Sequence, residues 1–376
     1  MSHMKRRTIP ILTATALAAA LLAGCVESST QTVTTEEGPG QKDGKGGGAM
    51  GQGGGNEGAG SAGLDKSSDT ELQEMLENVQ DKYKQDTWTD EEKGLTVDYN
   101  IYVPDGYAGD CTLPIVFFIG DATTAENDVS CSLTQGWGGI VWATDEVQEK
   151  NPCLVVTLVF PEVVLDDHGS CTTTDYLDAV PEIITDITEK YGADRSRIYG
   201  TGQSMGAMTT LYTAARNPDL YAGVLIVDGQ WDISTLSGLK DVNLLYITAA
   251  GDESATDGQT EVKEMLTDEG LTISSVTDLD AFLADDASTK QELEDAVSSM
   301  LAEGSLYNFI NWKAGSVLTA YGGNGSEHMA AFDLQTVNCF DSLQVAILGK
   351  PPERKKSPIQ ESKIGDSSEG SYPQRL

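Results

Sequence analysis

A serine flanked by two glycines is the pattern in this chain that most strongly indicates chemistry. Gly202-Gln203-Ser204-Met205-Gly206 follows a strand-like apolar segment and precedes a helix-like segment, residues 207–215. A sharp turn between a strand and a helix needs glycines two positions before and after the serine, because larger side chains would collide there. Such a turn exposes the hydroxyl, and the following helix N-terminus favours developing negative charge. We therefore predict that Ser204 is a nucleophile.

A serine hydroxyl needs a general base, and histidine is the usual one because it titrates near neutrality. The chain has three histidines, His3, His168 and His328. In enzymes with this turn the acid and then the histidine follow the serine along the chain, and only His328 lies in that position. We predict His328, in the glycine-rich stretch 322–328, as the base. We interpret His168 as a solvated loop residue, at most at the border of the pocket.

The third member of such a site is a carboxylate that orients the imidazole and stabilises its charged form. Asp252 fits this role best, because it follows the expected strand at residues 244–248 by a few positions. Glu253 and Asp257 remain alternatives, since a carboxylate in a loop is common in so acidic a chain.

Two backbone N–H groups are expected to bind the oxyanion. One belongs to Met205, directly after the nucleophile. The other should come from the loop after residues 115–119, where Asp121, or alternatively Ala122, offers its amide. An ionised Asp121 aimed at the site would oppose the oxyanion. Its side chain is therefore expected to point away or to accept bonds from local backbone amides.

Strand-like and helix-like segments alternate around these residues. The expected strands are residues 96–103, 115–119, 154–160, 197–200, 223–227, 244–248 and, as the last, 307–312. The expected helices begin at a capping box, residues 68–71, and include residues 180–191, 207–215, 291–301 and a closing helix at 330–348, with two helix-like segments inside 260–303. Continuous apolar runs suit strands that are buried on both faces. The rhythm predicts an α/β fold with an open, mostly parallel sheet and helices on both faces.

The stretch Tyr191–Gly206, with its lead-in Tyr-x-x-Asp-x-x-Arg-Ile-Tyr, resembles the esterase group that contains polyhydroxybutyrate depolymerases, feruloyl esterases and bacterial predicted peptidases related to prolyl oligopeptidase. The resemblance extends over residues 96–348. It implies the α/β-hydrolase fold and an acyl-enzyme mechanism with neither metal nor organic cofactor. The His-Gly that this group often carries after its third strand is Ile119-Gly120 here, which puts the oxyanion geometry in question.

An ester is therefore the expected substrate. A serine peptidase of the prolyl-oligopeptidase type is the alternative, but no segment is long enough for the extra domain that filters peptides in those enzymes. A non-catalytic binding lipoprotein on a hydrolase scaffold is the alternative from another class. Trp137, Gln203 and Trp231 are candidate pocket residues, although tryptophans in such loops are more often packing residues.

The N-terminal segment predicts the compartment. Lys5, Arg6 and Arg7 precede an apolar run, residues 9–22, which ends just before Cys25. We interpret residues 1–24 as a lipoprotein signal peptide and Cys25 as the acylated residue, with an ordinary secretory leader as the alternative. Residues 1–3 are interpreted as foreign to the natural protein. The expected location is outside the cytoplasm, anchored to the bacterial membrane by lipid.

The remaining chain divides by composition. Residues 25–67 form a flexible glycine-rich tether, residues 68–349 the catalytic domain and residues 350–376 a polar tail that we expect to be disordered. The formal net charge of −35 argues against a nucleic-acid partner.

The cysteines suggest disulfides. The chain has six cysteines, and assigning Cys25 to lipid leaves an odd number. We hypothesise that bridges join Cys111 to Cys153 and Cys131 to Cys171, with Cys339 free. No Cys-x-x-Cys or histidine-rich spacing indicates a metal site.

Overall fold

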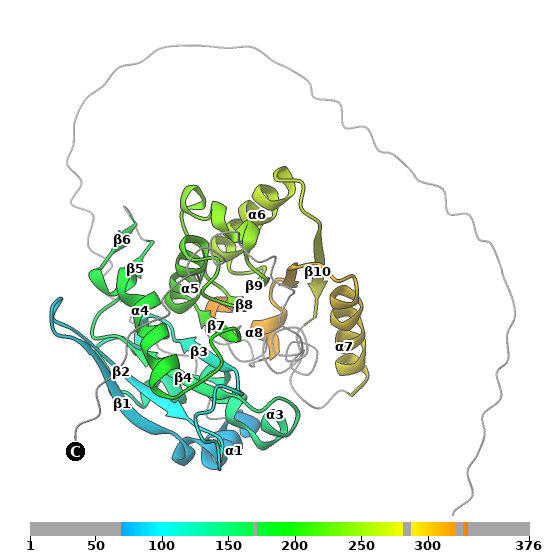
Figure 1. Ribbon diagram of the computed structural model, residues 1–376. Coiled ribbons are helices and arrows are strands. Elements are labelled where there is room, and N and C mark those ends of the chain that lie inside the picture. The colour runs from blue at the N-terminus through cyan, green and yellow to red at the C-terminus, as the bar shows by residue number, and fades with distance from the viewer. Residues whose placement is uncertain (1–68, 168–170, 281–286, 321–325, 330–376) are drawn as a thin grey trace, which may run out of the picture. The chain divides into compact units, whose positions relative to one another are not determined.

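The computed structural model describes residues 69–167, 171–280, 287–320 and 326–329. In these residues a nine-stranded sheet has the order β1-β2-β4-β3-β7-β8-β9-β11-β10 (Figure 1). Its strands are β1 (Lys84–Asp90), β2 (Leu95–Tyr102), β3 (Ile115–Ile119), β4 (Leu154–Val159), β7 (Ile198–Gln203), β8 (Gly223–Val227), β9 (Leu244–Ala249), β10 (Ile273–Leu279) and β11 (Tyr307–Trp312). The β1–β2 and β2–β4 pairs are antiparallel and the other pairs are parallel. The prediction of a mostly parallel sheet is therefore confirmed.

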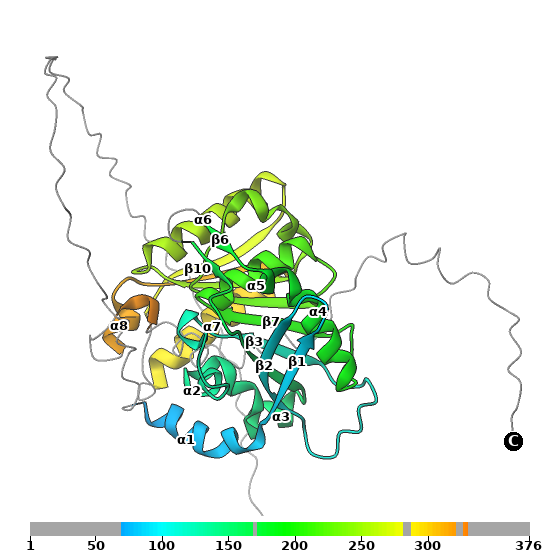
Figure 2. The same ribbon diagram turned by 90° about the vertical axis from the view of Figure 1, so that its left-hand side faces the viewer.

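Helices cover both faces of this sheet. The helices are α1 (Thr70–Val79), α2 (Cys131–Thr134), α3 (Asp145–Lys150), α4 (Asp175–Lys190), α5 (Met205–Arg216), α6 (Glu253–Asp268), α7 (Ala287–Ala302) and α8 (Ser316–Ala320). Side chains of α4, α5 and α6 join one core cluster, and side chains of α1, α2, α7 and α8 join a second cluster across the sheet (Figures 1 and 2). Alternate residues of one strand enter different clusters, as Phe117 and Val116 of β3 do. The strands β3, β4, β7, β8 and β9 are buried throughout for this reason.

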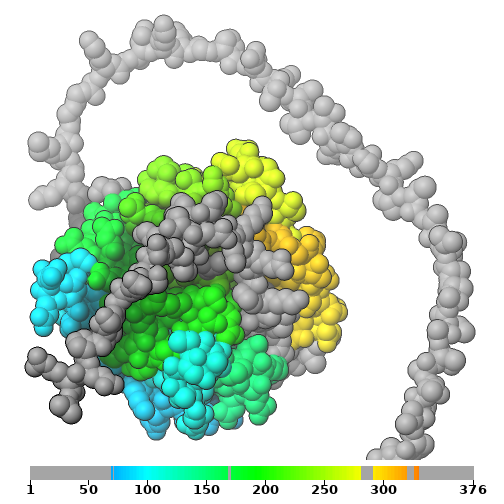
Figure 3. Space-filling view, viewed as in Figure 1, coloured from blue at the N-terminus to red at the C-terminus, as the bar shows by residue number. Residues whose placement is uncertain are grey.

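The sequence order maps across the sheet. The early elements and the late elements lie on opposite sides of the central segments, which Figure 3 colours green. The nucleophile turn thus falls near the middle of the sheet, between β7 and α5. A separate ribbon of β5 (Leu165–Asp166) and β6 (Thr172–Thr173) lies outside the sheet. Short 3-10 helices occupy Gln80–Lys82, Ala122–Thr124, Trp137–Gly139, Val141–Ala143, Ile233–Thr235 and Ser237–Asp241.

The sequence did not predict two strands of the large sheet, β1 and β10, or the short strands β5 and β6 outside it. β1 consists mostly of polar residues and is little buried. β10 is a half-exposed edge strand, and it separates the two helix-like segments, which are α6 and α7. At the start of α1 the cap is Asp69, whose carboxylate accepts the Leu72 N–H at 2.9 Å. The expected closing helix at 330–348 lies outside the described residues, as do Cys25, the leader and Cys339.

The two predicted disulfides are wrong. Cys111, Cys131, Cys153 and Cys171 are all free thiols. Cys153 is buried beside Trp142 and Gln148, whereas Cys111 is exposed. Burial raises the pKa of the Cys153 thiol to about 12, which makes it an inert packing residue. None of the described helices is long and apolar enough to span a membrane.

Candidate active site

Ser204 lies in a strained turn between β7 and α5. Its φ is +52°, a left-handed conformation that a residue with a side chain rarely adopts. The flanking glycines make the turn possible: a Cβ on Gly202 would collide with the backbone of Gly206, and a Cβ on Gly206 would collide with the carbonyl of Ile119. Such strain at a half-buried polar side chain is a mark of a functional position.

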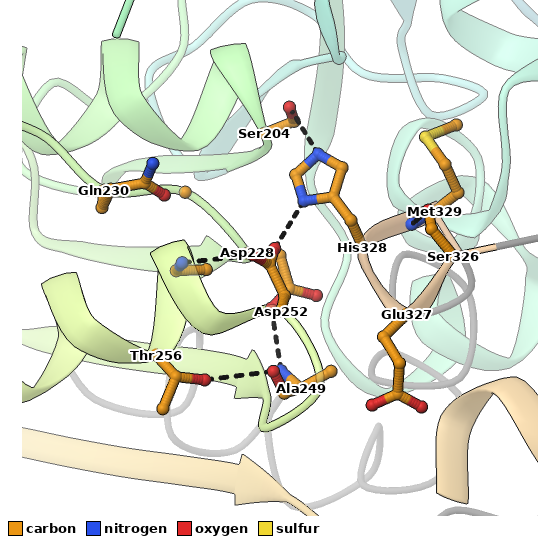
Figure 4. A network of polar contacts seen from close by, with 12 residues as sticks. Ser204, Asp228, Gln230, Ala249, Asp252, Thr256, Ser326, Glu327, His328 and Met329 are labelled. Atoms are coloured by element: carbon orange, nitrogen blue, oxygen red, sulfur yellow. Dashed lines mark hydrogen bonds and ion pairs between the residues drawn. The ribbon is translucent and has the colours of Figure 1, made fainter. Parts of the chain in front are cut away.

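His328 joins the serine to a carboxylate. Its Nε2 lies 2.8 Å from the Ser204 Oγ, and its Nδ1 lies 2.6 Å from the Asp252 Oδ2 (Figure 4). The three side chains come from the turn after β7, from the start of α6 and from a short helical segment, residues 327–329, late in the chain. The structure thus brings together the three residues that the sequence singled out, in the order in which a proton relay requires them.

Asp252 is itself held in place. It is the N-cap of α6, and its second oxygen, Oδ1, accepts the Ala255 N–H at 3.2 Å. The carboxylate therefore serves the helix end with one oxygen and the imidazole with the other. The two alternatives, Glu253 and Asp257, lie within α6 and are exposed, and it is Asp252 that forms the hydrogen bond with Nδ1 of His328.

Glu327, which the sequence did not single out, connects the segment that carries His328 to the segment that carries Asp252. Glu327 is only 8% exposed, and its carboxylate accepts two backbone N–H groups, from Gly251 at 3.1 Å and from Leu318 at 3.0 Å. A Cβ on Gly251 would lie 2.5 Å from Oε2 of Glu327, so glycine is the residue that fits there. The position next to a candidate base was the only sequence signal for this role.

The electrostatics favour a charged imidazole. Burial disfavours the imidazolium, but the hydrogen bond of Asp252 and the charges of Asp228, Asp252 and Asp121 outweigh it, so the pKa of His328 is raised above its ordinary value. Asp228 is fully buried directly after β8 and was also not singled out by the sequence. Three carboxylates from three different elements thus act on one imidazole.

Of the two amides considered for the oxyanion loop, the structure favours Ala122. The N–H of Asp121 donates to the Gln135 Oε1 at 3.2 Å, and the Asp121 carboxylate accepts the Thr123 N–H at 2.7 Å as the cap of the 3-10 helix Ala122–Thr124. Asp121 therefore bonds to a local amide, as expected, but its own N–H is engaged elsewhere. Ala122 and Met205 both line the cavity beside Ser204.

A cavity of about 420 Å³ opens next to the serine. Its apolar lining includes Val163, Leu165 and Met208, and its polar lining is rich in carboxylates. In the described part of the chain it is lined by Ala122, Val163, Leu165, Asp166, Asp167, Ser204, Met205, Met208, Asp228, Gly229, Gln230, Asp252, Ser254 and His328. The Gln230 amide donates to Asp167, which joins the loop after β8 to the loop after β5.

The three candidate pocket residues do not line this cavity. Trp137 is 7% exposed, belongs to the second core cluster and donates to Asp69 at 3.3 Å. Trp231 is 7% exposed and packs edge-on against Tyr212. Gln203, the last residue of β7, is 2% exposed. Both tryptophans are thus packing residues. His168 lies outside the described residues, and among those described no cluster of His, Cys, Asp or Glu has the geometry to hold a metal ion.

Solved structures of esterases share the fold of this chain. A thermostable esterase matches with a TM-score of 0.54 at 20% identity, over 72% of this chain and 63% of that chain. The protein thus spans less than two thirds of that esterase. A mutant of the feruloyl esterase module from Clostridium thermocellum, complexed with sinapinate, matches with a TM-score of 0.47 at 13% identity over 72% of this chain and 89% of the module. No protein-family model and no curated protein matches the chain. The first likeness shows that the chain has the α/β-hydrolase fold.

Proposed function

We propose that this protein is a serine carboxylic-ester hydrolase that acts through an acyl-enzyme intermediate. One observation carries the proposal: Ser204, His328 and Asp252 form a continuous relay, with 2.8 Å from the serine Oγ to Nε2 and 2.6 Å from Nδ1 to the carboxylate. A hydroxyl at a strained turn, in contact with a histidine that a carboxylate orients, is the arrangement that activates serine as a nucleophile.

In the first half-reaction the Ser204 Oγ attacks the ester carbonyl carbon, and its proton passes to Nε2 of His328. The carbonyl oxygen becomes an oxyanion. Collapse of the tetrahedral intermediate breaks the bond to the alcohol oxygen, which leaves with the proton from His328. Asp252 stabilises the imidazolium while it exists. In the second half-reaction water attacks the acyl-enzyme by the same steps, and the carboxylic acid leaves.

The N–H groups of Met205 and Ala122 are the proposed oxyanion donors. Met205 is the first residue of α5, so its amide has no partner one helical turn earlier. Ala122 opens the 3-10 helix after β3 and lies in the cavity wall. Donors fixed in the backbone before reaction stabilise charge without reorganising.

The acyl or alcohol part of the substrate is proposed to occupy the cavity of about 420 Å³. A pocket of this size suits a small organic group rather than a long chain. Esters are favoured over peptides because the fold is shared with a known esterase. A panel of p-nitrophenyl acetate, butyrate and aryl esters beside matched peptide anilides tests this choice. We expect hydrolysis of esters by the wild type and none by Ser204→Ala. Cleavage of anilides without cleavage of esters would support the peptidase. If neither class of substrate is turned over, the result would support the binding lipoprotein.

We also propose that the protein is anchored outside the cytoplasm by lipid on Cys25. The support is the sequence alone, in which basic residues and an apolar run precede this cysteine. Growth of the producing bacterium with an alkyne fatty acid should label the wild-type protein and not the Cys25→Ala variant. Equal labelling of both would contradict the anchor.

A further inference from the structure

A second carboxylate, Asp228, lies beside the proposed base and takes no part in the relay described above. It directly follows β8, the strand next to the one that carries the nucleophile turn. The carbonyl of its predecessor, Val227, accepts the backbone N–H of Ser204 at 3.1 Å. The serine turn and Asp228 are therefore held by the same strand end.

The backbone around Asp228 is tightly constrained. Its φ is +41°, and of non-glycine residues asparagine and aspartate tolerate this region best. A Cβ on the next residue, Gly229, would lie 2.6 Å from the Ala207 Cβ and 2.7 Å from the Ser204 carbonyl oxygen. The loop after β8 thus packs directly behind the nucleophile. A strained conformation at such a position indicates that the side chain is placed for a purpose.

Asp228 is shielded from bulk solvent but borders the cavity next to the serine. Asp228 is 0% exposed as a residue, yet it lines the cavity with Ser204 and His328. Its Oδ1 accepts the Ala249 N–H at 2.8 Å, which fixes its orientation (Figure 4). In Figure 4 the side chains of Asp228 and Asp252 are both on the side of the imidazole away from Ser204. A buried charge costs free energy unless something compensates it, and a nearby imidazolium would do so.

We propose that Asp228 is a positioning residue of the active site, a second carboxylate that stabilises the imidazolium of His328 alongside Asp252. The proposal rests on the function proposed above. Its charge acts through space, while Asp252 holds the ring by a direct hydrogen bond. Consistent with this, the charge of Asp228 raises the pKa of His328. The effect is greatest in the tetrahedral stages, when the imidazole carries the proton.

Other charged groups face the same imidazole, and their effects on it must be distinguished from the effect of Asp228. They are Asp252 from α6, Asp121 from the loop after β3, and Asp166 and Asp167, which line the cavity from β5 and the loop after it. Glu327, the residue before His328, accepts hydrogen bonds from the backbone of Gly251 and Leu318. The experiment therefore changes the charge of Asp228 alone and leaves these groups in place.

Asparagine is the substitution that isolates the charge. In Asp228→Asn the side-chain oxygen can still accept the Ala249 N–H, and asparagine suits the left-handed backbone, so the structural role is kept. Asp257→Asn is the matched control, because it removes one negative charge from an exposed site on α6. Asp228→Ala removes the acceptor as well and measures the structural role by thermal unfolding.

The primary readout is the ionisation of His328 followed by NMR. The chain has three histidines, so a protein labelled at histidine gives few imidazole signals, and His328→Gln assigns the relevant one. We expect Asp228→Asn to lower the pKa of His328 by about one unit and to lower kcat on the pH plateau roughly tenfold. An unchanged pKa of His328, or the same change in Asp257→Asn, would overturn the proposal.

Two further measurements separate the possible failures. In the Asp252→Asn background, adding Asp228→Asn should lower kcat again by about tenfold, and no further loss would contradict an independent contribution. A purely structural role would lower kcat equally at every pH and leave the pKa of His328 unchanged. The NMR titration needs no substrate. Absence of ester hydrolysis by the wild type would therefore reject the proposed reaction, whereas an unshifted imidazole would reject the role of Asp228.

Discussion

The Oε2 of Glu327 lies 3.1 Å from the backbone nitrogen of Gly251, and this bond joins the neighbours of the two residues that hold the relay together. Glu327 precedes the base and Gly251 precedes Asp252. The bond therefore fixes the spacing of the two loops independently of the contact between His328 and Asp252.

Glu327→Ala should lower kcat by up to about a hundredfold, because a misplaced histidine loop weakens proton transfer. Glu327→Gln keeps one acceptor oxygen of the two that Gly251 and Leu318 use, so its loss should be smaller. Steady-state kinetics on a p-nitrophenyl ester measure both variants. If Glu327→Ala has the same kcat as the wild type, the hydrogen bonds of Glu327 have no role in catalysis.

Ala122→Pro should remove one oxyanion donor without breaking the fold. Ala122 is exposed and is the first residue of a 3-10 helix, and Asp121 before it is extended, with φ −73° and ψ 176°. Both positions are compatible with proline, which lacks an N–H. We expect kcat to fall by about 10²- to 10³-fold with little change in the melting temperature.

Ala122→Gly, which keeps the amide, is the control for this loop. It should retain most of the activity. If proline leaves kcat unchanged while the protein stays folded, the second oxyanion donor is not the Ala122 amide.

Asp252→Asn should lower kcat by about 10³- to 10⁴-fold, because an amide neither stabilises the imidazolium nor enforces the required tautomer. Its oxygen can still accept the Ala255 N–H, so the start of α6 is preserved. Glu253→Gln and Asp257→Asn are matched controls on the same helix and should stay near wild-type activity. A larger loss of kcat in either control than in Asp252→Asn would show that the control residue, and not Asp252, is the acid of the relay.

The acid limb of kcat/KM should lie above the ordinary histidine value of 6.5. His328 must be neutral to accept the serine proton, and a raised pKa extends the charged form to higher pH. Activity is therefore lost on acidification at a higher pH than for an unperturbed histidine, and kcat/KM reports this ionisation in the free enzyme. A pH–rate profile with its acid limb below 6.5 would contradict the electrostatics of the site.

Most of the parallel sheet was predictable because its strands are continuous apolar runs, as Ile115–Ile119 is. β1 was not, since its polar residues are stabilised by pairing with β2 rather than by burial. Among the site residues, Ser204 follows from local turn geometry, and His328 follows from the scarcity of histidine. Glu327 and Asp228 depend on contacts between loops far apart in the chain, which no local pattern encodes.

The disulfide hypothesis failed for a related reason. Cysteine order along the chain gives no account of which face of the sheet each residue occupies, and Cys153 is buried while Cys111 is exposed. The choice between Asp121 and Ala122 also needed the structure, because only the position of Gln135 shows that one amide is engaged.

Covalent labelling of Ser204 tests the central claim most directly. The purified protein is treated with a fluorophosphonate, and intact-mass and peptide mass spectrometry locate the adduct. We predict one phosphonyl group on Ser204 in the wild type, none in Ser204→Ala, and much slower labelling in His328→Gln. A folded wild-type protein that gains no adduct, or gains it at another residue, would contradict the account.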